Sequence, residues 1–569
     1  FENEQFPDGY IDLRTSRMWI DDEKEHIDKE FKKFHDFWDN NSCEIGTIKC
    51  KIEPLKDELL AYFEQTSPTS VKELELKKYP KLFPYQENAR DAWIDNDGIG
   101  IFEMGTGTGK TFTALGCIQK LQESHEKLLV IVAAPYTNLV DQWQQESKKF
   151  YFEPPARILD GKGWIGKLRD TISAFNTNGD SIQMLICTHA KFARQELIDE
   201  IKNAKMPVVL IADEAHHVGA GNTEKDDDGV VSSEGGRKGL SEYYKYRLAL
   251  SATINRHRDD EGTVFLREYF KSKKGIDTVY EYTLERAIKE KKLCEYYYYP
   301  YWVELTPAEF DDYRDKTIRA VRMLGSKKQE IRTKGEDLLK QRALIIRDAE
   351  EKISRFPEVM KDLIKKLNND VRHLLLFCSE NQYDESEDIL DYPEPNFNYK
   401  DRIDHVRITY KDPPNKKDRI TILDDFKNEI WHVVLSNRVL DEGMDVPQAK
   451  SCIILASTTN PAQFIQRRGR VLRTFSGTYK DGTKKKYAYI FDLLVRPNID
   501  GIENVSKDKK HTIEDIQNAR KYEIRIIRNQ LEKIVTMSKL AKNYDPDLKE
   551  KIEEFRHGLP DECFEFDSN

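Results

Sequence analysis

A glycine-rich run at residues 102–111 (FEMGTGTGKT) constrains the fold more than any other part of the sequence. An apolar, strand-like segment at 99–101 precedes it, and a helix-forming segment follows it directly. Glycines let successive backbone N–H groups converge on one anion, and the start of a helix adds partial positive charge. Lys110 can reach the β- and γ-phosphates of ATP, and the Thr111 hydroxyl can bind the Mg²⁺ that they share. The run predicts a phosphate-binding loop, although Met104 stands where the usual pattern has its first glycine.

A second polar group, DEAH at 213–216, follows a strand-like run at 208–212. A carboxylate at the carboxyl end of a parallel strand lies at the edge where such folds bind ligands. There Asp213 can hold Mg²⁺, and Glu214 can orient and deprotonate an attacking water. Together with Lys110, this pair favours a nucleotide-hydrolysing site over a plain turn rich in glycine and threonine.

Composition limits what surrounds this site. The 569 residues are enough for about three to four domains. A net charge of −10 argues against polyanion binding by the whole surface but permits a local basic channel. Because the sequence contains neither a long apolar run nor a signal-like start, we expect no membrane partner and a cytoplasmic location. The eight cysteines form no CxxC pair, which predicts small core residues in a reducing compartment and no zinc site.

Apolar runs such as 128–134 are typical of strands in a parallel sheet, and they occur in two regions separated by charge-dense helical patterns. We therefore expect an α/β fold with two parallel-sheet domains. The expected segments are an N-terminal extension at 1–80, a first α/β domain at 81–304, a basic helical insertion at 305–370, a second α/β domain at 371–500 and a C-terminal helical extension at 501–569. The lack of an initiator Met predicts a fragment or a processed chain.

Three segments need separate interpretation. Within 313–347, 11 Lys+Arg against 4 Asp+Glu indicate either a solvated helical face or an arm that contacts phosphates. The aromatic run at 296–302 (YYYYPYW) indicates either a base-stacking platform or, as we favour, a strand with alternating side chains that enters the linker between domains. The polar segment at 219–239 is predicted to be a mobile surface loop rather than an acidic binding site.

The order and spacing of short motifs over about residues 81–495 resemble those of superfamily 2 helicases and translocases, which have two tandem RecA-like domains. The matching runs are PYQ at 84–86, the glycine-rich run, APY at 134–136, CTH at 187–189, DEAH, SAT at 251–253, FCS at 377–379, a motif V-like run at 436–447 and a motif VI-like run at 463–473.

This resemblance implies roles for individual residues. ATP would be bound by Gln86, Gly105, Thr106, Gly107, Thr108, Gly109, Lys110, Thr111, Gly443 and Asp445, with Mg²⁺ held by Thr111 and Asp213. Catalysis would fall to Lys110, Asp213, Glu214, Arg467 and Arg470. Nucleic acid would meet Pro135, Thr188 and Asn437, and the two sites would be coupled through His216, Ser251, Thr253 and Gln466.

The two arginines have a physical reason. Phosphoryl transfer spreads negative charge over the γ-phosphate oxygens, and a guanidinium from the facing domain stabilises that charge only when the cleft closes. Arg467 and Arg470, three residues apart on one helical face, can both point into such a cleft.

Within the superfamily, the runs at 246–253, 258–260 and 279–293 look like the XPB-like branch. The element at 258–260 reads RDD, where that branch carries Arg-Glu-Asp. The segments at 16–19 and 25–38 look like the tail of the phospholipase-D-like modules that precede some prokaryotic helicases. The HxK signature of those modules does not occur in this sequence, so nuclease activity is not carried over.

The resemblance implies a motor that hydrolyses ATP to move along or unwind nucleic acid, with DNA favoured over RNA. A prokaryotic defence, restriction or repair system, with a nuclease or another defence-complex protein as partner, is the expected setting. Two alternatives stay open: a translocase on double-stranded DNA that does not unwind it, and an ATP-gated scaffold subunit whose partner carries the chemistry.

Overall fold

The structure, a computed structural model, describes most of the chain after residue 79. The described ranges are 80–150, 152, 155–159, 163–177, 182–205, 207–219, 223–225, 231–234, 236–256, 259–409, 413, 416–437, 446–456, 467–496, 498–503, 511–557 and 559–564. Nearly all of the N-terminal extension expected at 1–80, with its segments at 16–19 and 25–38, lies outside them. So does much of the loop expected at 219–239.

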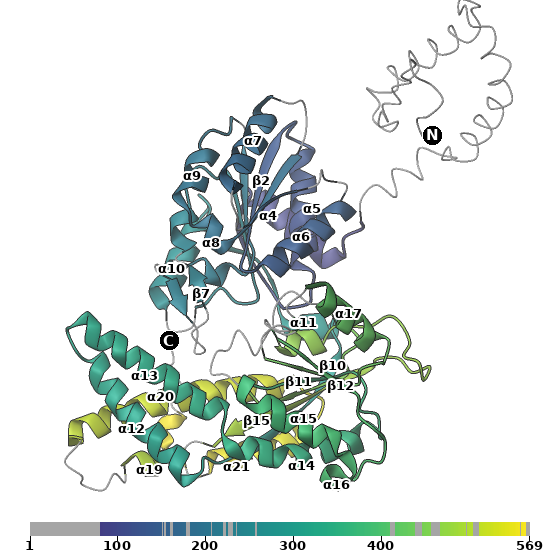
Figure 1. The fold of residues 1–569 in the computed structure, drawn as a ribbon. Helices are drawn as coiled ribbons and strands as arrows, with labels where there is room; N and C mark the ends of the chain where they lie inside the picture. The colour runs from purple at the N-terminus through teal and green to yellow at the C-terminus, as the bar shows by residue number, and fades with distance from the viewer. Residues whose placement is uncertain are drawn as a thin grey trace, which may run out of the picture. The chain divides into compact units, whose positions relative to one another are not determined.

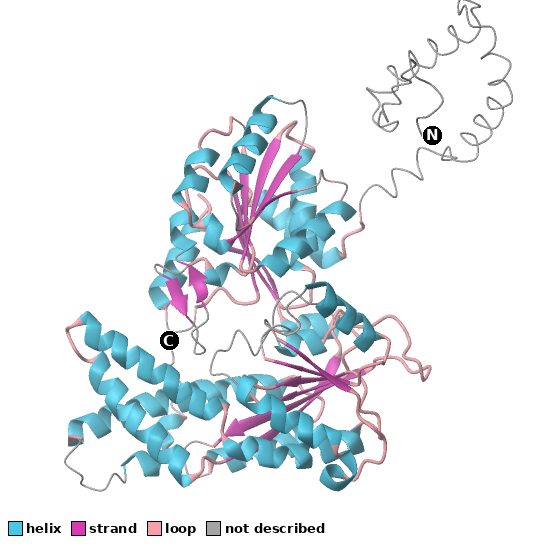
Figure 2. Cartoon of the chain, viewed as in Figure 1, coloured by secondary structure: helices cyan, strands magenta, loops and turns pink. Residues whose placement is uncertain are grey.

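Seven parallel strands form the first sheet, in the order β3-β4-β2-β5-β8-β1-β9. The strands are β1 Ile99–Met104, β2 Leu128–Ala134, β3 Ala156–Ile158, β4 Ile182–Thr188, β5 Val208–Ala212, β8 Tyr246–Ser251 and β9 Thr278–Tyr282. Helices flank this sheet (Figures 1 and 2): α4 Pro84–Asp95, α5 Lys110–Gln122, α6 Thr137–Lys149, α7 Trp164–Thr177, α8 His189–Phe192, α9 Gln195–Ile201 and α10 Asp260–Tyr269. Helix α11 (Leu284–Lys289) follows β9 on the way to the second sheet. A separate hairpin pairs β6 Thr223–Lys225 with β7 Val231–Glu234.

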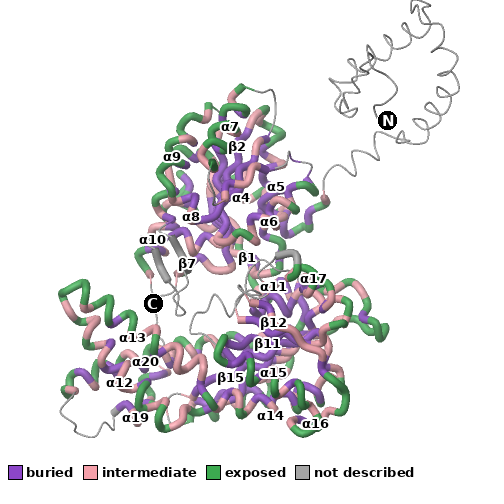
Figure 3. Tube along the Cα trace, in the orientation of Figure 1, coloured by how far each residue is buried: buried purple, intermediate pink, exposed green. Residues whose placement is uncertain are grey.

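Both faces of the first sheet are buried, and its strands stand out as buried in Figure 3. All seven residues of β2 are buried. Val130 and Val132 belong to one apolar core, whereas Leu129 and Ile131 belong to another. Since successive side chains of a strand point to opposite faces, a strand covered on both faces must be apolar throughout. This explains the continuous apolar runs in the sequence.

A second sheet contains six parallel strands in the order β10-β15-β14-β11-β13-β12. The strands are β10 Glu295–Val303, β11 Leu374–Phe377, β12 His405–Ile408, β13 Val433–Ser436, β14 Ser451–Ile454 and β15 Tyr487–Val495. The helices of this region are α14 Glu350–Lys366, α15 Tyr383–Asp391, α16 Pro393–Phe397 and α17 Lys416–Lys427. The α/β fold with two parallel-sheet domains is therefore confirmed.

The boundary expected at residue 304 is wrong. The aromatic run 296–302 does form a strand, but this strand, β10, pairs along its whole length with β15 of the second sheet. The second domain therefore begins before Glu295. Alternation of side chains predicts a strand but does not say which sheet it joins, because its partner lies about 190 residues further along the chain.

The expected helical insertion at 305–370 divides into two parts. Helices α12 (Pro307–Leu324) and α13 (Gln329–Arg347) form a hairpin, and α12 packs against the C-terminal helix α20 (Ile513–Lys539) (Figure 1). Helix α14 instead packs on the second sheet, where Phe356 and Met360 share a core with Leu374. The C-terminal extension also contains α19 Ile499–Glu503 and α21 Lys549–Arg556.

A buried ion pair joins the hairpin to α20. The Arg342 guanidinium lies 2.5 Å from a Glu523 carboxylate oxygen, and both side chains are almost fully buried. The Tyr313 hydroxyl donates to the other Glu523 oxygen at 2.7 Å and also accepts from Arg342. Other hairpin cations, such as Arg319, pair with carboxylates on their own helix. Part of the basic character noted at 313–347 is thus used inside the protein.

We predict that Glu523→Ala weakens this helical bundle strongly, because it leaves Arg342 buried without its counter-charge. The free energy of unfolding of the bundle should fall by about 3–5 kcal/mol. Chemical denaturation combined with hydrogen exchange across α13 and α20 measures this change. The control is Glu146→Ala, which removes the partner of the exposed Lys149 and should have little effect. Equal effects of the two substitutions would contradict the prediction.

Candidate functional site

Backbone geometry shapes the glycine-rich run into a loop between β1 and α5. Gly107 and Gly109 have φ values of 86° and 82°, a region that favours glycine. Helix α5 begins at Lys110, so the unpaired N–H groups of its first turn lie next to the loop. The Lys110 ammonium donates to the Met104 carbonyl at 3.4 Å. Because Met104 contributes this backbone carbonyl and buries its side chain in the core, its position does not require glycine.

Helix α4 supports the loop from one side. The Tyr85 hydroxyl donates to the Thr108 carbonyl at 2.6 Å, and the Tyr85 ring stacks on Tyr282 with 4.1 Å between ring centroids. The Gln86 side-chain amide donates to the Gly109 carbonyl at 3.3 Å, and its oxygen accepts from the backbone of α4's cap residue. Gln86 thus connects α4 to the loop, while its expected contact with adenine stays a prediction.

Two carboxylates follow β5, as expected. Asp213 is buried and accepts a hydrogen bond from the Trp143 indole at 2.7 Å. A Glu214 carboxylate oxygen lies 3.6 Å from the Lys110 ammonium, so the structure brings the loop lysine and this acid together. Glu214 has a left-handed backbone with φ of 44°, which is uncommon for a residue with a side chain.

Of these two acids, Asp213 has the chemistry of a ligand for a divalent cation. Burial, and then the charge of Glu214, raise the pKa of Asp213 above its ordinary value. A hard cation would relieve this repulsion, and it would find the oxygen ligands that Mg²⁺ prefers in the Asp213 carboxylate and the hydroxyl of Thr111, the second residue of α5.

Neutral histidines connect the acids to neighbouring strands. A His216 ring nitrogen lies 3.0 Å from the Ser251 hydroxyl, and that hydroxyl donates to the Thr253 carbonyl. Burial, and then His217, lower the pKa of His216 well below its ordinary value. His189 lies 3.0 Å from the Asp213 carbonyl and has a pKa lowered to about 3, chiefly by burial. Both rings therefore keep their neutral hydrogen-bonding state near pH 7.

The residues expected to couple the two sites are thus partly in contact: His216, Ser251 and Thr253 form one hydrogen-bonded chain. The fourth, Gln466, lies outside the described residues, as do Gly443 and Asp445. His189 belongs to the CTH run and stands directly after the end of β4. That position is the sequence signal for its contact with Asp213.

Arg467 is bound within the second domain. Its guanidinium donates to the Ala456 carbonyl at 2.6 Å and to the Asn437 carbonyl at 3.1 Å, and it lies over the Phe377 ring. Its side chain is 1% exposed. These contacts indicate that Arg467 holds the strand ends β13 and β14 together, which differs from the role expected for it at the γ-phosphate.

Other residues of the motif VI-like run approach the phosphate-binding loop. A Cβ placed on Gly469 would lie 2.5 Å from the Cβ of Thr106, and one placed on Gly107 would lie 3.2 Å from Cγ of Arg473. Arg470 lies between them in sequence and is 6% exposed. Arg473 is not among the residues expected at the γ-phosphate, although it repeats the three-residue spacing of Arg467 and Arg470.

The three residues expected to meet nucleic acid follow or end parallel strands. Pro135 follows β2, Thr188 ends β4, and Asn437 follows β13. Thr188 also caps α8, accepting from the backbone of Lys191 at 3.4 Å. All three stand at carboxyl ends of strands, the edge of an α/β sheet where ligands bind.

Two protein-family models match this chain. The model described as "Type III restriction enzyme, res subunit" matches residues 79–256. The model described as "Helicase conserved C-terminal domain" matches residues 356–475. Together they cover the phosphate-binding loop, the acid pair and the helical residues 467–471, called here the arginine-rich helix.

Similar proteins agree with these matches. The DNA 3'-5' translocase XPB2 of Sulfurisphaera tokodaii is 26% identical over 448 residues, which span 75% of this chain and 84% of the relative. Among solved structures, the ATP-dependent Type ISP restriction-modification enzyme LlaBIII bound to DNA is similar in fold, with a TM-score of 0.52 at 17% identity. That similarity covers 84% of this chain but only 32% of the enzyme, so the chain spans about a third of its length. None of the helices in the described ranges has the length and apolarity needed to cross a membrane.

We predict that Gly109→Ala destabilises the first domain and that Gly105→Ala does not. A left-handed alanine costs about 1–2 kcal/mol, and its Cβ would lie 2.7 Å from the Gln86 amide nitrogen. The nearest atom to a Cβ on Gly105 is 3.6 Å away, an ordinary contact. Chemical denaturation of the ligand-free protein measures both substitutions. A larger loss for Gly105→Ala would contradict the loop geometry.

Proposed function

Because this chain belongs to superfamily 2 of helicases and translocases, on the XPB-like branch, we propose that it hydrolyses ATP to move along or unwind DNA. One observation carries the proposal. Gly469 and Arg473 of the motif VI-like run lie against Thr106 and Gly107 of the phosphate-binding loop. A nucleotide in this loop would therefore touch both sheet domains, as a motor driven by opening and closing requires.

Residues of the first domain have different roles at the phosphates. Bound ATP with Mg²⁺ supplies the phosphoanhydride bond to be broken and the charge to be neutralised. In the proposal, Lys110 binds the β- and γ-phosphates, and Thr111 and Asp213 hold Mg²⁺. Glu214 orients the attacking water and accepts its proton on the carboxylate. The strained backbone at Glu214 and its distance of 3.6 Å from Lys110 support this assignment.

The second domain contributes positive charge. We assign the γ-phosphate contacts to Arg470 and Arg473, because the segment that carries them adjoins the loop at Gly469 and at Arg473 itself. Arg467, whose guanidinium already donates to two backbone carbonyls, positions the arginine-rich helix instead. A guanidinium that approaches only when the domains close makes hydrolysis depend on closure.

Coupling to DNA would follow the hydrogen-bonded chain from Glu214. His216 lies 3.7 Å from a Glu214 oxygen and 3.0 Å from the Ser251 hydroxyl, so a shift at the acid reaches the end of β8. The proposed DNA groove runs over Pro135, Thr188 and Asn437 and contacts the phosphate backbone without reading sequence. The similarity to a DNA translocase and to a restriction-modification enzyme bound to DNA supports a DNA substrate rather than an RNA substrate.

Two narrower functions remain candidates. Translocation on double-stranded DNA in a restriction or defence complex, with a nuclease as partner, is favoured by the match to the restriction-enzyme family model. An ATP-gated scaffold is the other candidate, with the helices after residue 500 as its docking surface. Strand-displacement and triplex-displacement assays, run side by side, separate unwinding from translocation.

Lys110→Ala and Glu214→Gln should each lower DNA-stimulated ATP turnover by about 10²–10⁴-fold, because one removes a phosphate contact and the other the proton acceptor. Turnover measured with single-stranded DNA, double-stranded DNA and RNA also identifies the preferred substrate. Lys120→Ala, on an exposed part of the same helix α5, is the matched control and should leave turnover unchanged. Unchanged turnover in both active-site variants would refute the motor.

The roles assigned to Arg473 and Arg467 predict that replacing the first lowers ATP turnover and replacing the second lowers stability. Arg473→Ala should lower turnover by about 10³-fold while leaving the unfolding midpoint unchanged. Arg467→Ala should lower the unfolding free energy of the second domain by about 1–3 kcal/mol, because two buried carbonyls lose their donor. Turnover and chemical denaturation measured on both variants test this difference. A full-turnover Arg473→Ala protein would overturn the assignment.

A further inference from the structure

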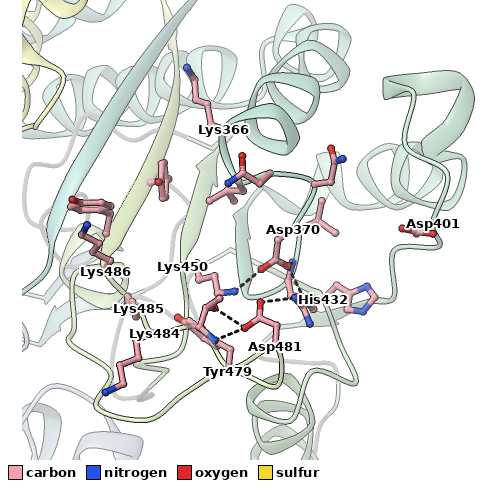
Figure 4. Close-up of a pocket in the computed structure, with 18 of the residues that line it drawn as sticks. Lys366, Asp370, Asp401, His432, Lys450, Tyr479, Asp481, Lys484, Lys485 and Lys486 are labelled. Atoms are coloured by element: carbon pink, nitrogen blue, oxygen red, sulfur yellow. Dashed lines mark hydrogen bonds and ion pairs between the residues drawn. The ribbon is translucent and has the colours of Figure 1, made fainter.

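A pocket of about 650 Å³ opens at the amino-terminal edge of the second sheet (Figure 4). Arg372, His432, Lys450 and Lys486 line it, and they stand just before β11, β13, β14 and β15. Because these strands are parallel, their starts share one edge. Arg467 binds at the opposite edge, beyond the ends of β13 and β14. With four residues in each of those strands, the two edges are about 13 Å apart. The pocket therefore lies away from Arg467, and its rim adjoins the proposed ATP site only through Lys485, which donates to the Arg473 carbonyl.

The floor of the pocket is an ion-pair network in which two cations, Arg372 and Lys450, meet three carboxylates. Arg372 pairs with Asp370 at 2.8 Å, with Glu429 at 2.9 Å and with Asp481 at 3.1 Å. Lys450 pairs with Asp370 at 2.6 Å. A network with this many partners holds its residues in place but offers little net charge to a ligand. The floor therefore supplies shape rather than attraction.

The rim supplies the attraction. Lys485 is anchored by donating to the carbonyls of Pro447, Val471 and Arg473, at 2.9, 2.8 and 2.7 Å. Its neighbours Lys484 and Lys486 are exposed and have no carboxylate within ion-pair distance among the described residues. Figure 4 shows these three lysines on the same side of the pocket. Seven Lys or Arg side chains and three carboxylates line the pocket. Three further carboxylates outside the lining, Asp362, Asp404 and Glu429, pair with lining cations, so the attraction comes chiefly from Lys484 and Lys486.

Half-buried tyrosines adjoin this rim. Tyr487 and Tyr489, both in β15, line the pocket. The Tyr297 ring of β10 stacks on Tyr489 with 5.2 Å between centroids and meets Tyr487 edge-on at 5.5 Å. The Lys486 ammonium lies 5.1 Å from the Tyr487 ring centre. Aromatic rings beside lysines on a rigid floor are the combination that binds exposed nucleobases and their phosphates.

The aromatic run of β10 explains why these rings are available. Alternation along the strand buries Tyr296 and Tyr298 completely, whereas Tyr297 and Tyr299 keep partial exposure on the other face. One face of the strand therefore builds the core, and the other places Tyr297 against Tyr487 and Tyr489, whereas base stacking by this run stays a prediction.

We propose that this pocket is a second nucleic-acid site, which binds one nucleotide unit of a single strand. Lys484 and Lys486 contact its phosphates, and the base stacks against Tyr487. A duplex is excluded as occupant because its bases are already stacked and paired, whereas a single strand presents a free face to an aromatic ring. The site goes beyond the proposed motor groove, which lies at carboxyl ends of strands. It would hold a strand that has been separated from its partner, or a tail next to the duplex being travelled.

Photocrosslinking tests this site directly. The full chain is irradiated with a short oligothymidylate that carries one 5-iododeoxyuridine, and crosslinked peptides are identified by mass spectrometry. We expect a crosslink in the peptide that contains Tyr487 and Tyr489. In Lys484→Ala/Lys486→Ala its yield should fall about tenfold. The dependence of log yield on log salt should become shallower by about 1.4, because two phosphate contacts of a single strand are lost.

The controls separate this inference from its alternatives. Lys271→Ala/Lys273→Ala removes the same charge from exposed lysines of the first domain and should keep the crosslink. Crosslinks confined to other peptides, or equal losses in both double variants, would overturn the proposal. Competition by thymidine monophosphate at the same concentration as the oligonucleotide would assign the pocket to free nucleotides and also overturn it. If DNA stimulates ATP turnover but the Tyr487 peptide is not crosslinked, the second nucleic-acid site is refuted and the proposed motor stands. If the peptide is crosslinked but DNA does not stimulate turnover, the motor is refuted and the second site stands.

Discussion

The pairing of β10 with β15 is the interaction on which the rest of this structure depends. It carries the chain out of the first domain and along the edge of the second sheet. Just before it, Leu293 pairs with Arg473, and the Cys294 amide donates to the Leu472 carbonyl at 2.8 Å. A Cβ placed on Gly107 would lie 3.4 Å from a methyl carbon of Leu293, so Leu293 also adjoins the phosphate-binding loop. One strand thus fixes the arginine-rich helix next to the phosphate-binding loop.

The C-terminal segment secures the same strand. As an edge strand, β10 would otherwise leave backbone groups unpaired. The Asn543 side chain donates to the Tyr298 carbonyl at 2.9 Å and accepts from its amide at 3.0 Å. Arg468, inside the arginine-rich helix, donates to the Met537 sulfur of α20 at 2.7 Å. Within α20, the Met537 carbonyl also accepts from the Tyr296 hydroxyl of β10 at 2.7 Å. Helix α20 therefore contacts the hairpin, the edge strand and the arginine-rich helix, so a partner that moved it would reach the proposed ATP site.

Sequence patterns predicted most of the local structure. The strand expected at 208–212 is β5, and the one expected at 128–134 is β2, because strands buried on both faces must be apolar without interruption. The loop before α5 and the acids after β5 were also predicted, since each motif needs only neighbouring residues. Arg473 was not, because it lies past the end of the helix, in a bridge with Leu293, and a pairing between residues so far apart in the chain leaves no local pattern. The sheet that β10 joins could not be predicted either, because its partner strand β15 is also distant in the sequence.

The sequence by itself determined the elements and the chemical groups: two sets of parallel strands, a glycine-rich loop before a helix, an acid pair after a strand and a run rich in arginine. The tertiary structure alone decided which arginine lies beside the loop, which cations of the insertion are already paired, and where the aromatic strand presents its half-buried face. The physical reason is the range of the interactions. Turn geometry and side-chain alternation act over a few residues, whereas ion pairs, sheet edges and pockets are formed by residues that only folding brings together.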